Sequence, residues 1–322
     1  MNNTSNSLVS GIDPASFSAV TGPSQDLFRF VNGPWVDMYR LPDDRSRYGS
    51  FDKLAEDAEN QIRDILEEDD CPAVKSRALY HSFLDVDAID AAGLAAIEDQ
   101  LASIDEAEDK AALTRALGAM NPTGGPDLIG IAVYGDPGAP ETNVVHIEQD
   151  GLDLPDEAYY REDHYAPIRE AYVEMVAKQL KNAHLAADDE DAHAQAKRFL
   201  DVETRIAANH WDNVSTRDSV KTYNPTDYAD LCAMLADVDL DAWIDAWQNA
   251  YDATTAAAVQ PLDFRGCFSH TIVHEPSFLT GLNAFWKEAS LDDLKLWARV
   301  HVVIGSTLEL PHEFDETNFD FY

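Results

Sequence analysis

This 322-residue chain contains two His-Glu dipeptides, and paired histidines can bind a catalytic metal. A hydrolytic zinc site of the His-Glu-x-x-His type puts two imidazoles on one helix face with a general base between them. His-Glu dipeptides begin at His274 and at His312. Four positions on stand Phe278 and Glu316, and Pro276 would break a helix in the first case. Neither dipeptide therefore forms the motif.

A second histidine spacing, from His270 to His274, would suit two metal ligands on a helix. The intervening residues 271–273 are Thr-Ile-Val, which favour an extended strand instead. Four strand residues rise about 13 Å, too far for two imidazoles to share one ion. We therefore predict that this chain binds no metal and that both are ordinary core or surface histidines.

Other catalytic motifs are absent from the sequence: there is no GxSxG elbow, P-loop, GxGxxG turn or EF-hand. Cys71, Cys232 and Cys267 are far apart and lack CxxC spacing, so we expect buried thiols and neither a disulfide framework nor a zinc site. Acidic pairs such as Asp201 and Glu203 are too common here to single out a glycosidase pair. The sequence thus assigns no catalytic residue.

One polar cluster could bind substrate: Arg45, Arg47, Tyr48 and Asp52, just before a predicted helix. A guanidinium group matches the terminal carboxylate of a peptide, and a nearby aspartate would steady it. The alternative is local salt bridges to the two aspartates before Arg45, with Ser50 as the helix N-cap. The residues alone favour this second interpretation.

The charge balance restricts the partners of the protein. The chain has 23 Lys and Arg against 60 Asp and Glu, a formal net charge of -37, with the acids spread along its length. This potential repels phosphate backbones and anionic lipids, so no nucleic acid and no membrane partner is expected. The first residues resemble no secretory signal, and no stretch is apolar enough to span a bilayer. We expect a cytoplasmic protein.

Helical periodicity dominates from Phe51 onward, where apolar residues predict a helix with one buried stripe. Residues 1–50 are rich in Gly, Pro, Asn and Ser and predict an irregular arm with a short helix at 26–31. Residues 128–134 and 144–149 predict two strands of a small hairpin. The aromatic ending at Phe319, Phe321 and Tyr322 is unusual for a terminus and suggests a truncated boundary. Further helices are expected at 74–84, 88–101, 107–119, 168–183, 192–211, 228–235, 240–251, 278–286 and 291–308, with 188–191 as a hydrated loop capping the helix that follows it.

Several blocks of sequence, in order, resemble the neprilysin-like zinc metallopeptidase family, which includes bacterial oligopeptidase O. The match extends from about Asp13 to Tyr322. The chain is identified as an amino-terminal portion of such an enzyme. The blocks are Asp-Leu-Phe-Arg-Phe-Val-Asn-Gly-Pro-Trp at 26–35, Leu-Pro at 41–42, Arg-Tyr-Gly-Ser-Phe-Asp at 47–52, Gly-Leu-Asp-Leu-Pro-Asp-Glu-Ala-Tyr-Tyr at 151–160, Glu-Thr-Arg-Ile-Ala at 203–207, Arg-Asp at 217–218, Tyr-Asn-Pro at 223–225 and Pro-Ser-Phe-Leu at 276–279.

The resemblance implies a mainly α fold, the helical cap lobe of a two-lobed metallopeptidase, with a small β-hairpin. It implies that residues 1–50 are an irregular arm associated with the catalytic lobe, that 51–322 form an incomplete helical cap lobe, and that the catalytic lobe is absent. The lobes of such enzymes enclose a chamber that admits oligopeptides. Zinc would be held by the missing half, so none is expected here. The implied partners are oligopeptide substrates and that missing catalytic half of the same polypeptide.

The resemblance also raises the importance of two residues. The substrate-side arginine of the family and the aspartate five residues on fall on Arg47 and Asp52, which implies a substrate-binding role for both. A second family arginine falls on Ala55, which weakens recognition of a C-terminal carboxylate and favours a metalloendopeptidase. Without the zinc-binding half the chain is expected to be inactive. The alternative function is a non-catalytic acidic helical module that binds peptides or a protein.

Overall fold

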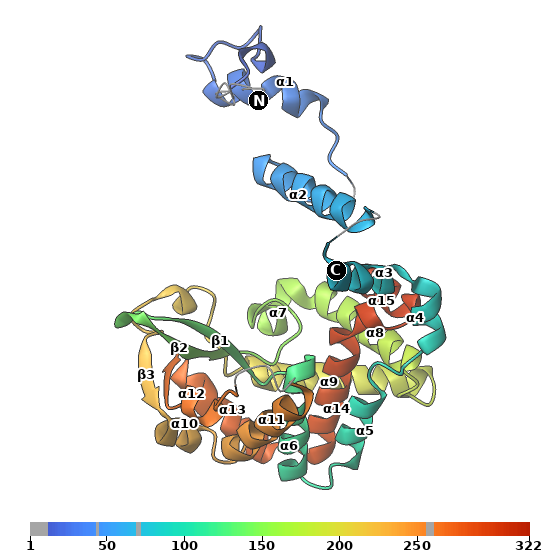
Figure 1. Cartoon of the computed structure of the whole chain (residues 1–322), viewed down its shortest axis with the longest axis vertical. Helices are drawn as coiled ribbons and strands as arrows, with labels where there is room; N and C mark the ends of the chain where they lie inside the picture. The colour runs from blue at the N-terminus through green and yellow to red at the C-terminus, as the bar shows by residue number, and fades with distance from the viewer. Residues whose placement is uncertain (1–11, 43–44, 69–71, 256–260) are drawn as a thin grey trace. The chain divides into compact units, whose positions relative to one another are not determined.

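A computed structural model describes residues 12–42, 45–68, 72–255 and 261–322, which divide into two compact units, Met1–Ser82 and Phe83–Tyr322 (Figure 1). The described residues are mainly α-helical, as the sequence and the resemblance predicted, and the predicted hairpin belongs to a small four-stranded sheet. The boundary between the units falls after Ser82. This boundary does not test the predicted separation of an arm at 1–50 from a cap lobe at 51–322. That assignment stays a prediction.

The first unit contains α1 (Leu27–Met38), α2 (Ser50–Glu67) and most of α3 (Val74–Leu84). Helix α1 is twice as long as the short helix predicted at 26–31, because Asp26 caps it and Pro34 does not end it. The arm is therefore less irregular than expected. Helix α2 begins where predicted, but no residue of it is buried, so its apolar stripe is not covered within this unit.

The second unit holds the remaining helices. The sequence predicted one helix at 88–101, but the structure has two helices there. Gly93, with φ of +59°, ends the first of them at Ala92, and the second begins at Glu98. The bounds are α4 (Val86–Ala92), α5 (Glu98–Glu106), α6 (Lys110–Met120), α7 (Ala158–Arg161), α8 (Ala166–Asn182), α9 (Asp189–Ala207), α10 (Tyr228–Met234), α11 (Leu240–Thr254), α12 (Phe264–Cys267), α13 (Pro276–Glu288), α14 (Leu291–Gly305) and α15 (His312–Phe319).

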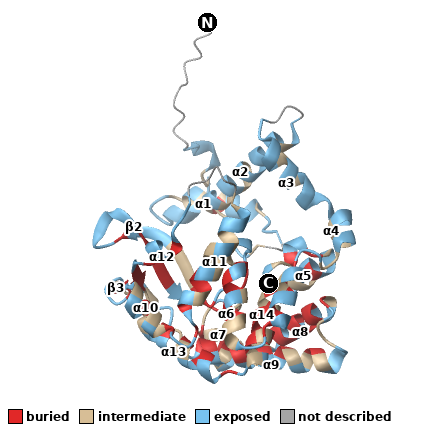
Figure 2. Ribbon diagram, turned by 60° about the horizontal axis from the view of Figure 1, so that its bottom comes forward, coloured by how far each residue is buried: buried red, intermediate tan, exposed pale blue. Residues whose placement is uncertain are grey.

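The core of this unit lies between packed helices: α9 packs on its neighbour α8 and on the distant α14, and α6 packs on the distant α11. Figure 2 shows the buried residues concentrated there. Asp188, in the predicted capping loop, accepts a hydrogen bond from the backbone N–H of Asp191, so the acids after it form the first turn of α9. The largest fully buried side chains include Trp286, Trp297, Tyr172 and Phe199.

The sheet has the strand order β1-β2-β4-β3. The predicted hairpin is confirmed as β1 (Ile129–Asp136) and β2 (Ala139–Gln149), paired antiparallel. The extended conformation expected between His270 and His274 is also confirmed, because β4 (His270–Val273) pairs parallel with β2. The sequence missed β3 (Asn224–Asp227), a four-residue edge strand that contains Pro225.

Two further expectations meet different outcomes. The thiol of Cys267 is exposed and that of Cys232 is half-buried, so the prediction of buried thiols is wrong for Cys267, which lies at the end of the short helix α12; Cys71 lies outside the described residues. In the part of the chain that is described, no helix has the length and hydropathy needed to cross a bilayer.

Candidate functional site

The two predicted substrate-binding residues, Arg47 and Asp52, lie at the start of α2 in the first unit. Asp52 Oδ2 accepts a 2.7 Å hydrogen bond from the backbone N–H of Gly49, the N-cap residue. Gly49 takes the position predicted for Ser50, which is the first residue of the helix. Arg47 is exposed and makes no ion pair or hydrogen bond among the described residues. Asp52 thus caps the helix, whereas the Arg47 guanidinium has no partner within that part of the chain.

The neighbouring members of this cluster, Arg45 and Tyr48, converge on Glu56. Arg45 Nη2 lies 3.3 Å from Glu56 Oε1, and the Tyr48 hydroxyl donates a 2.7 Å hydrogen bond to Oε2. The Tyr48 ring also stacks on Tyr39, with ring centroids 4.6 Å apart. The aspartates proposed as salt-bridge partners, 43 and 44, lie outside the described residues. Salt bridges to those two aspartates therefore stay a prediction, and among the described residues Arg45 pairs with Glu56.

In the second unit, a fully buried carboxylate, Glu203 of α9, organises the loop that follows β2. Its Oε1 accepts a 2.9 Å hydrogen bond from the backbone N–H of Asp153. Its Oε2 accepts from the hydroxyls of Tyr160 at 3.1 Å and Tyr172 at 2.9 Å. The imidazole Nε2 of His301, on α14, lies 3.1 Å from Oε1, within ion-pair distance but not aligned as a hydrogen bond. One side chain thus joins α8, α9, α14 and the loop at 151–160.

The protonation of this buried pair follows from its surroundings. Burial raises the pKa of Glu203, although His301 opposes the shift. Burial alone would lower the pKa of His301, but the Glu203 carboxylate beside it raises that pKa instead. The network extends to the last residue, because the Tyr322 hydroxyl donates a 2.6 Å hydrogen bond to Asp153 Oδ2.

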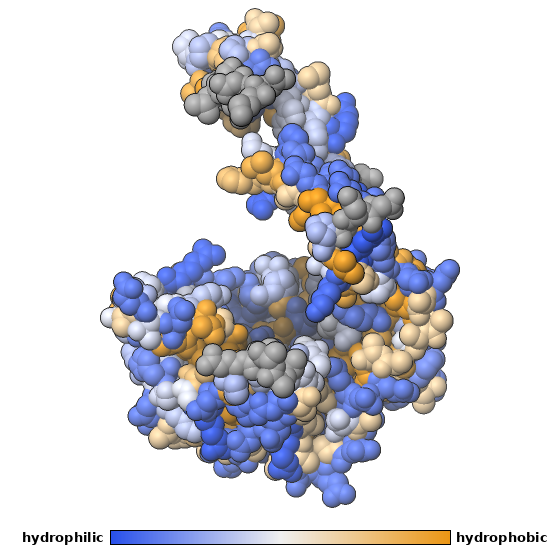
Figure 3. Space-filling view, viewed as in Figure 1, coloured by the Kyte–Doolittle hydropathy of each residue, from blue (hydrophilic) through white to orange (hydrophobic). Residues whose placement is uncertain are grey.

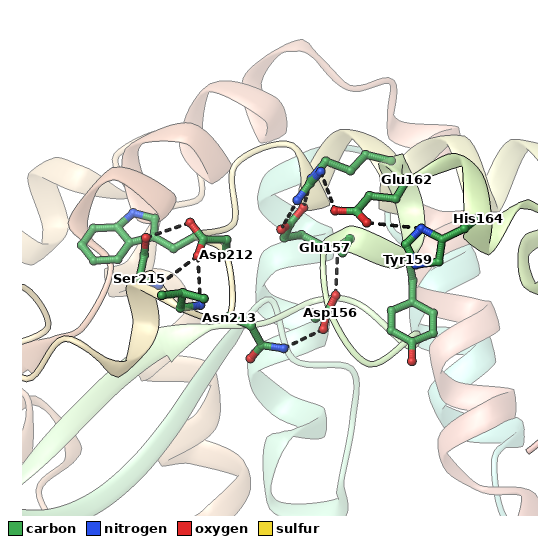
Figure 4. Close-up of polar contacts among 12 residues, drawn as sticks. Asp156, Glu157, Tyr159, Glu162, His164, Asp212, Asn213 and Ser215 are labelled. Atoms are coloured by element: carbon green, nitrogen blue, oxygen red, sulfur yellow. Dashed lines mark hydrogen bonds and ion pairs between the residues drawn. The ribbon is translucent and has the colours of Figure 1, made fainter.

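The loop held by Glu203 faces the turn after α9, and between them lie two adjoining hollows of about 170 and 480 Å³ that share His210. Figure 4 shows the polar contacts around them. Asp156 accepts a 2.7 Å hydrogen bond from the amide of Asn213, and Asp212 accepts one of 2.7 Å from the hydroxyl of Ser215. Asp212 is thus fixed within its own turn, whereas Asp156 joins the loop to that turn, so both acids shape the hollows.

The wall of the smaller hollow is built by Gln149 at the end of β2. Its amide brackets Trp211, accepting from the backbone N–H at 2.7 Å and donating to the carbonyl at 3.0 Å. His210 Nε2 lies 3.0 Å from the Asp150 carbonyl oxygen, and burial lowers the pKa of His210, which keeps that ring neutral. Glu275 accepts a 3.0 Å hydrogen bond from the Gln149 backbone N–H, and burial raises its pKa to about 7.

The histidines considered as metal ligands face different partners. His270 Nε2 lies 3.4 Å from Asp136 Oδ2, and His274 Nε2 lies 2.9 Å from His146 Nδ1. Among the described residues, no group of three or more His, Cys, Asp or Glu side chains is placed to hold a metal ion. The side chains described here therefore do not fit a catalytic zinc site.

Comparison with known proteins identifies the family. The amino-terminal sequence model of peptidase family M13 matches residues 23–322, so the chain belongs to peptidase family M13. Human neprilysin is 25% identical over 298 residues, which cover 86% of this chain and 39% of neprilysin. Membrane metallo-endopeptidase-like 1 of mouse is 26% identical over 212 residues, which cover 59% of this chain and 28% of that protein. The chain thus spans less than half of these relatives.

Solved structures agree. The zinc metalloprotease ZMP1 of Mycobacterium tuberculosis, in complex with an inhibitor, superposes with a TM-score of 0.84 at 30% identity, covering 98% of this chain and 47% of that chain. PEPO from Lactobacillus rhamnosis HN001 gives a TM-score of 0.73 at 17% identity, covering 94% of this chain and 46% of that chain, which shows a common fold alone. The resemblance stated from sequence blocks is therefore confirmed, and the fold is that of the M13 amino-terminal region.

Proposed function

We propose that this chain is the substrate-enclosing amino-terminal portion of a zinc metalloendopeptidase that hydrolyses oligopeptides. The observation that carries the proposal is the match of residues 23–322 to the M13 amino-terminal model, together with a span of only 47% of ZMP1. The zinc would belong to a catalytic half on the same polypeptide, because His-Glu-x-x-His does not occur in these 322 residues. By itself the chain would bind no zinc stoichiometrically and hydrolyse no peptide.

Helix α2 supplies a surface for that catalytic half. Phe51, Leu54, Ile62 and Ile65 are 87%, 62%, 57% and 49% exposed, so the apolar side of an 18-residue amphipathic helix has no cover within its own unit. Figure 3 shows hydrophobic surface along this helix. Large exposed apolar faces on a soluble protein usually mark an interaction site. We assign the partner as the catalytic half.

The proposal is tested by combining this chain with a separately expressed catalytic half, if the coding frame continues and encodes His-Glu-x-x-His. The expected result is that the complex cleaves a quenched fluorogenic peptide and contains one zinc ion by metal analysis. The chain alone should show neither cleavage nor bound zinc. Ile62→Asp should weaken the association, whereas Gln61→Asp, at an exposed polar position of the same helix, should not. Cleavage by the purified chain alone would refute the division of labour.

A role for Arg47 in substrate binding is part of the proposal. Its exposed guanidinium would contact peptide directly, whereas Asp52 would act by capping α2 and so fixing the loop that carries Arg47. Arg47→Ala in the complex should reduce kcat/KM for peptide cleavage, and peptides with free and with amidated C-termini should be compared to test whether Arg47 binds a carboxylate. An equal loss on both would exclude carboxylate recognition.

The location of the protein and the alternative function can be tested without measuring catalysis. A cytoplasmic location is proposed from the sequence, and cell fractionation with an antibody to the chain tests it. A non-catalytic acidic helical module that binds peptides or a protein is the alternative. It would be favoured if the coding frame ended without a zinc motif while the chain still bound peptide.

A further inference from the structure

The outer edge of the sheet in the second unit is an open β-strand. Strand β1 stands at the end of the order β1-β2-β4-β3, and among the residues that the structure describes it pairs with β2 alone. Every second residue of its eight therefore turns a backbone N–H and C=O away from the sheet. The distal half projects from the core, with Val133 64% and Tyr134 58% exposed. Figure 3 shows hydrophobic surface on this hairpin.

Strand β1 lacks the features that normally prevent an edge strand from pairing. Edge strands are usually protected by Lys, by Pro, by a bulge or by a short length. Residues 129–136 read Ile-Gly-Ile-Ala-Val-Tyr-Gly-Asp, with no Pro and no basic residue. The one charged side chain, Asp136, is buried, and the only register shift falls at the far end, between Gly135 and Asp136. The edge from Gly130 to Tyr134 is an unbroken template.

The hairpin is also held rigidly before any ligand arrives. Asp136 accepts hydrogen bonds from the Gly138 backbone N–H at 2.7 Å and from the Tyr223 hydroxyl at 3.0 Å, and the His270 ring lies 3.4 Å away. A side chain at Gly138 would meet the Tyr223 hydroxyl at 2.1 Å, which shows how closely the tip is packed against the start of β3. A docking strand would therefore not have to order its own template.

The charges beside this edge indicate what would bind. Glu148 stands directly across from Gly130, which has no side chain to cover it, and Glu141 is exposed nearer the tip of β2. Glu148 lies 3.6 Å from His274, whose pKa burial lowers, so the neutral ring leaves the carboxylate charge uncompensated. A second copy of this chain would bring another net charge of -37 to the contact. Charge complementarity thus favours a basic segment.

We propose that the outer edge of β1 is a non-catalytic docking site for an extended oligopeptide that carries Lys or Arg beside apolar residues. The peptide would add a fifth strand by main-chain hydrogen bonds, with its apolar side chains beside Val133 on one face of the sheet and its cations beside Tyr134 and Glu148 on the other. This inference rests on the proposed function, because it names the basic oligopeptides that the enzyme would concentrate before cleavage. The site itself breaks no bond.

The test is binding of a labelled eight-residue peptide of alternating lysine and valine to this chain, measured by fluorescence anisotropy. Val133→Lys should weaken binding at least tenfold, because it places a cation on the docking edge. The matched control is Val220→Lys at another exposed valine, 82% exposed, where no change is expected. A peptide methylated on every second backbone nitrogen should bind at least tenfold more weakly than its parent. Hydrogen exchange of β1 amides should slow at alternate residues when peptide is added.

Three results would overturn the proposal. Equal weakening by Val133→Lys and Val220→Lys, or equal binding of the methylated peptide, would show non-specific attraction to an acidic protein. A dimer of the free chain in sedimentation that Val133→Lys abolishes would assign the edge to a second copy. Because binding is measured without the catalytic half, cleavage by the assembled enzyme can succeed while this site fails, and the two failures are distinguishable.

Discussion

Replacing Glu203 by alanine tests the structural argument for the second unit most directly. The substitution removes the acceptor of hydrogen bonds from Asp153, Tyr160 and Tyr172 and leaves the His301 imidazole without its carboxylate. Hydrogen bonds to a charged group contribute about 1.5–3 kcal/mol each, but neighbours in one network do not add. Breaking a buried ion pair from one side costs about 3–5 kcal/mol, and we expect a loss of that size.

The assay is urea unfolding followed by circular dichroism, with thermal unfolding as a second measurement. For a unit of this length, the loss corresponds to a fall in Tm of roughly 6–20 °C. The matched control is Asp201→Ala, two residues earlier on the same helix but exposed, which should change stability by less than about 0.5 kcal/mol. A loss below about 1 kcal/mol for Glu203→Ala would show that the loop at 151–160 does not depend on this carboxylate.

Three further perturbations have definite expected outcomes. Gly118→Ala should lower the free energy of unfolding by about 1–3 kcal/mol, because the new Cβ would meet the Trp243 carbonyl oxygen at 2.3 Å. Gly305→Ala, whose Cβ would have nothing within 4 Å, should not lower it, and urea unfolding of both variants compares them. Glu275 has a pKa of about 7 in the folded chain against an ordinary 4.5, so between these pH values the folded chain keeps a proton that the unfolded chain releases. Its contribution to stability therefore falls as pH rises from about 4.5 to 7, and Glu275→Gln should flatten this pH dependence of the free energy of unfolding. Deleting Met1–Ser82 should leave the Tm of the main transition within about 3 °C, and a larger fall would mean that the first unit supports the second.

The fold class and most helices were predictable because apolar periodicity records burial directly. Leu291 to Leu308 predicted a helix, and α14 occupies most of that range. The misses have identifiable causes. Strand β3 has four residues and a proline, so its pairing comes from β4 and not from any pattern of its own. The break at Gly93 requires a positive φ, which the surrounding helical spacing conceals.

The candidate site was less accessible to sequence reasoning than the fold. Asp201 and Glu203 looked like one acidic pair among many, but a separation of two residues puts them on different sides of α9. Glu203 lies on the side of α9 that also buries Phe199 and Ile206. An acid on the apolar side of a predicted helix was the sequence feature that could have indicated a buried carboxylate. Its partner His301 comes from a helix about one hundred residues away, a contact that periodicity does not record.

The distribution of burial explains why the two units need different accounts. Among the described residues of Met1–Ser82, Gly33 alone is buried, whereas the second unit contains the whole hydrophobic core. Local hydrogen bonds such as those of Asp26 and Asp52 can begin helices, but isolated helices of this length are marginal in water without packing. The apolar face of α2 is therefore without packing partners in its own unit. Under the proposed function, the catalytic half would cover this face and add the packing that stabilises the helix.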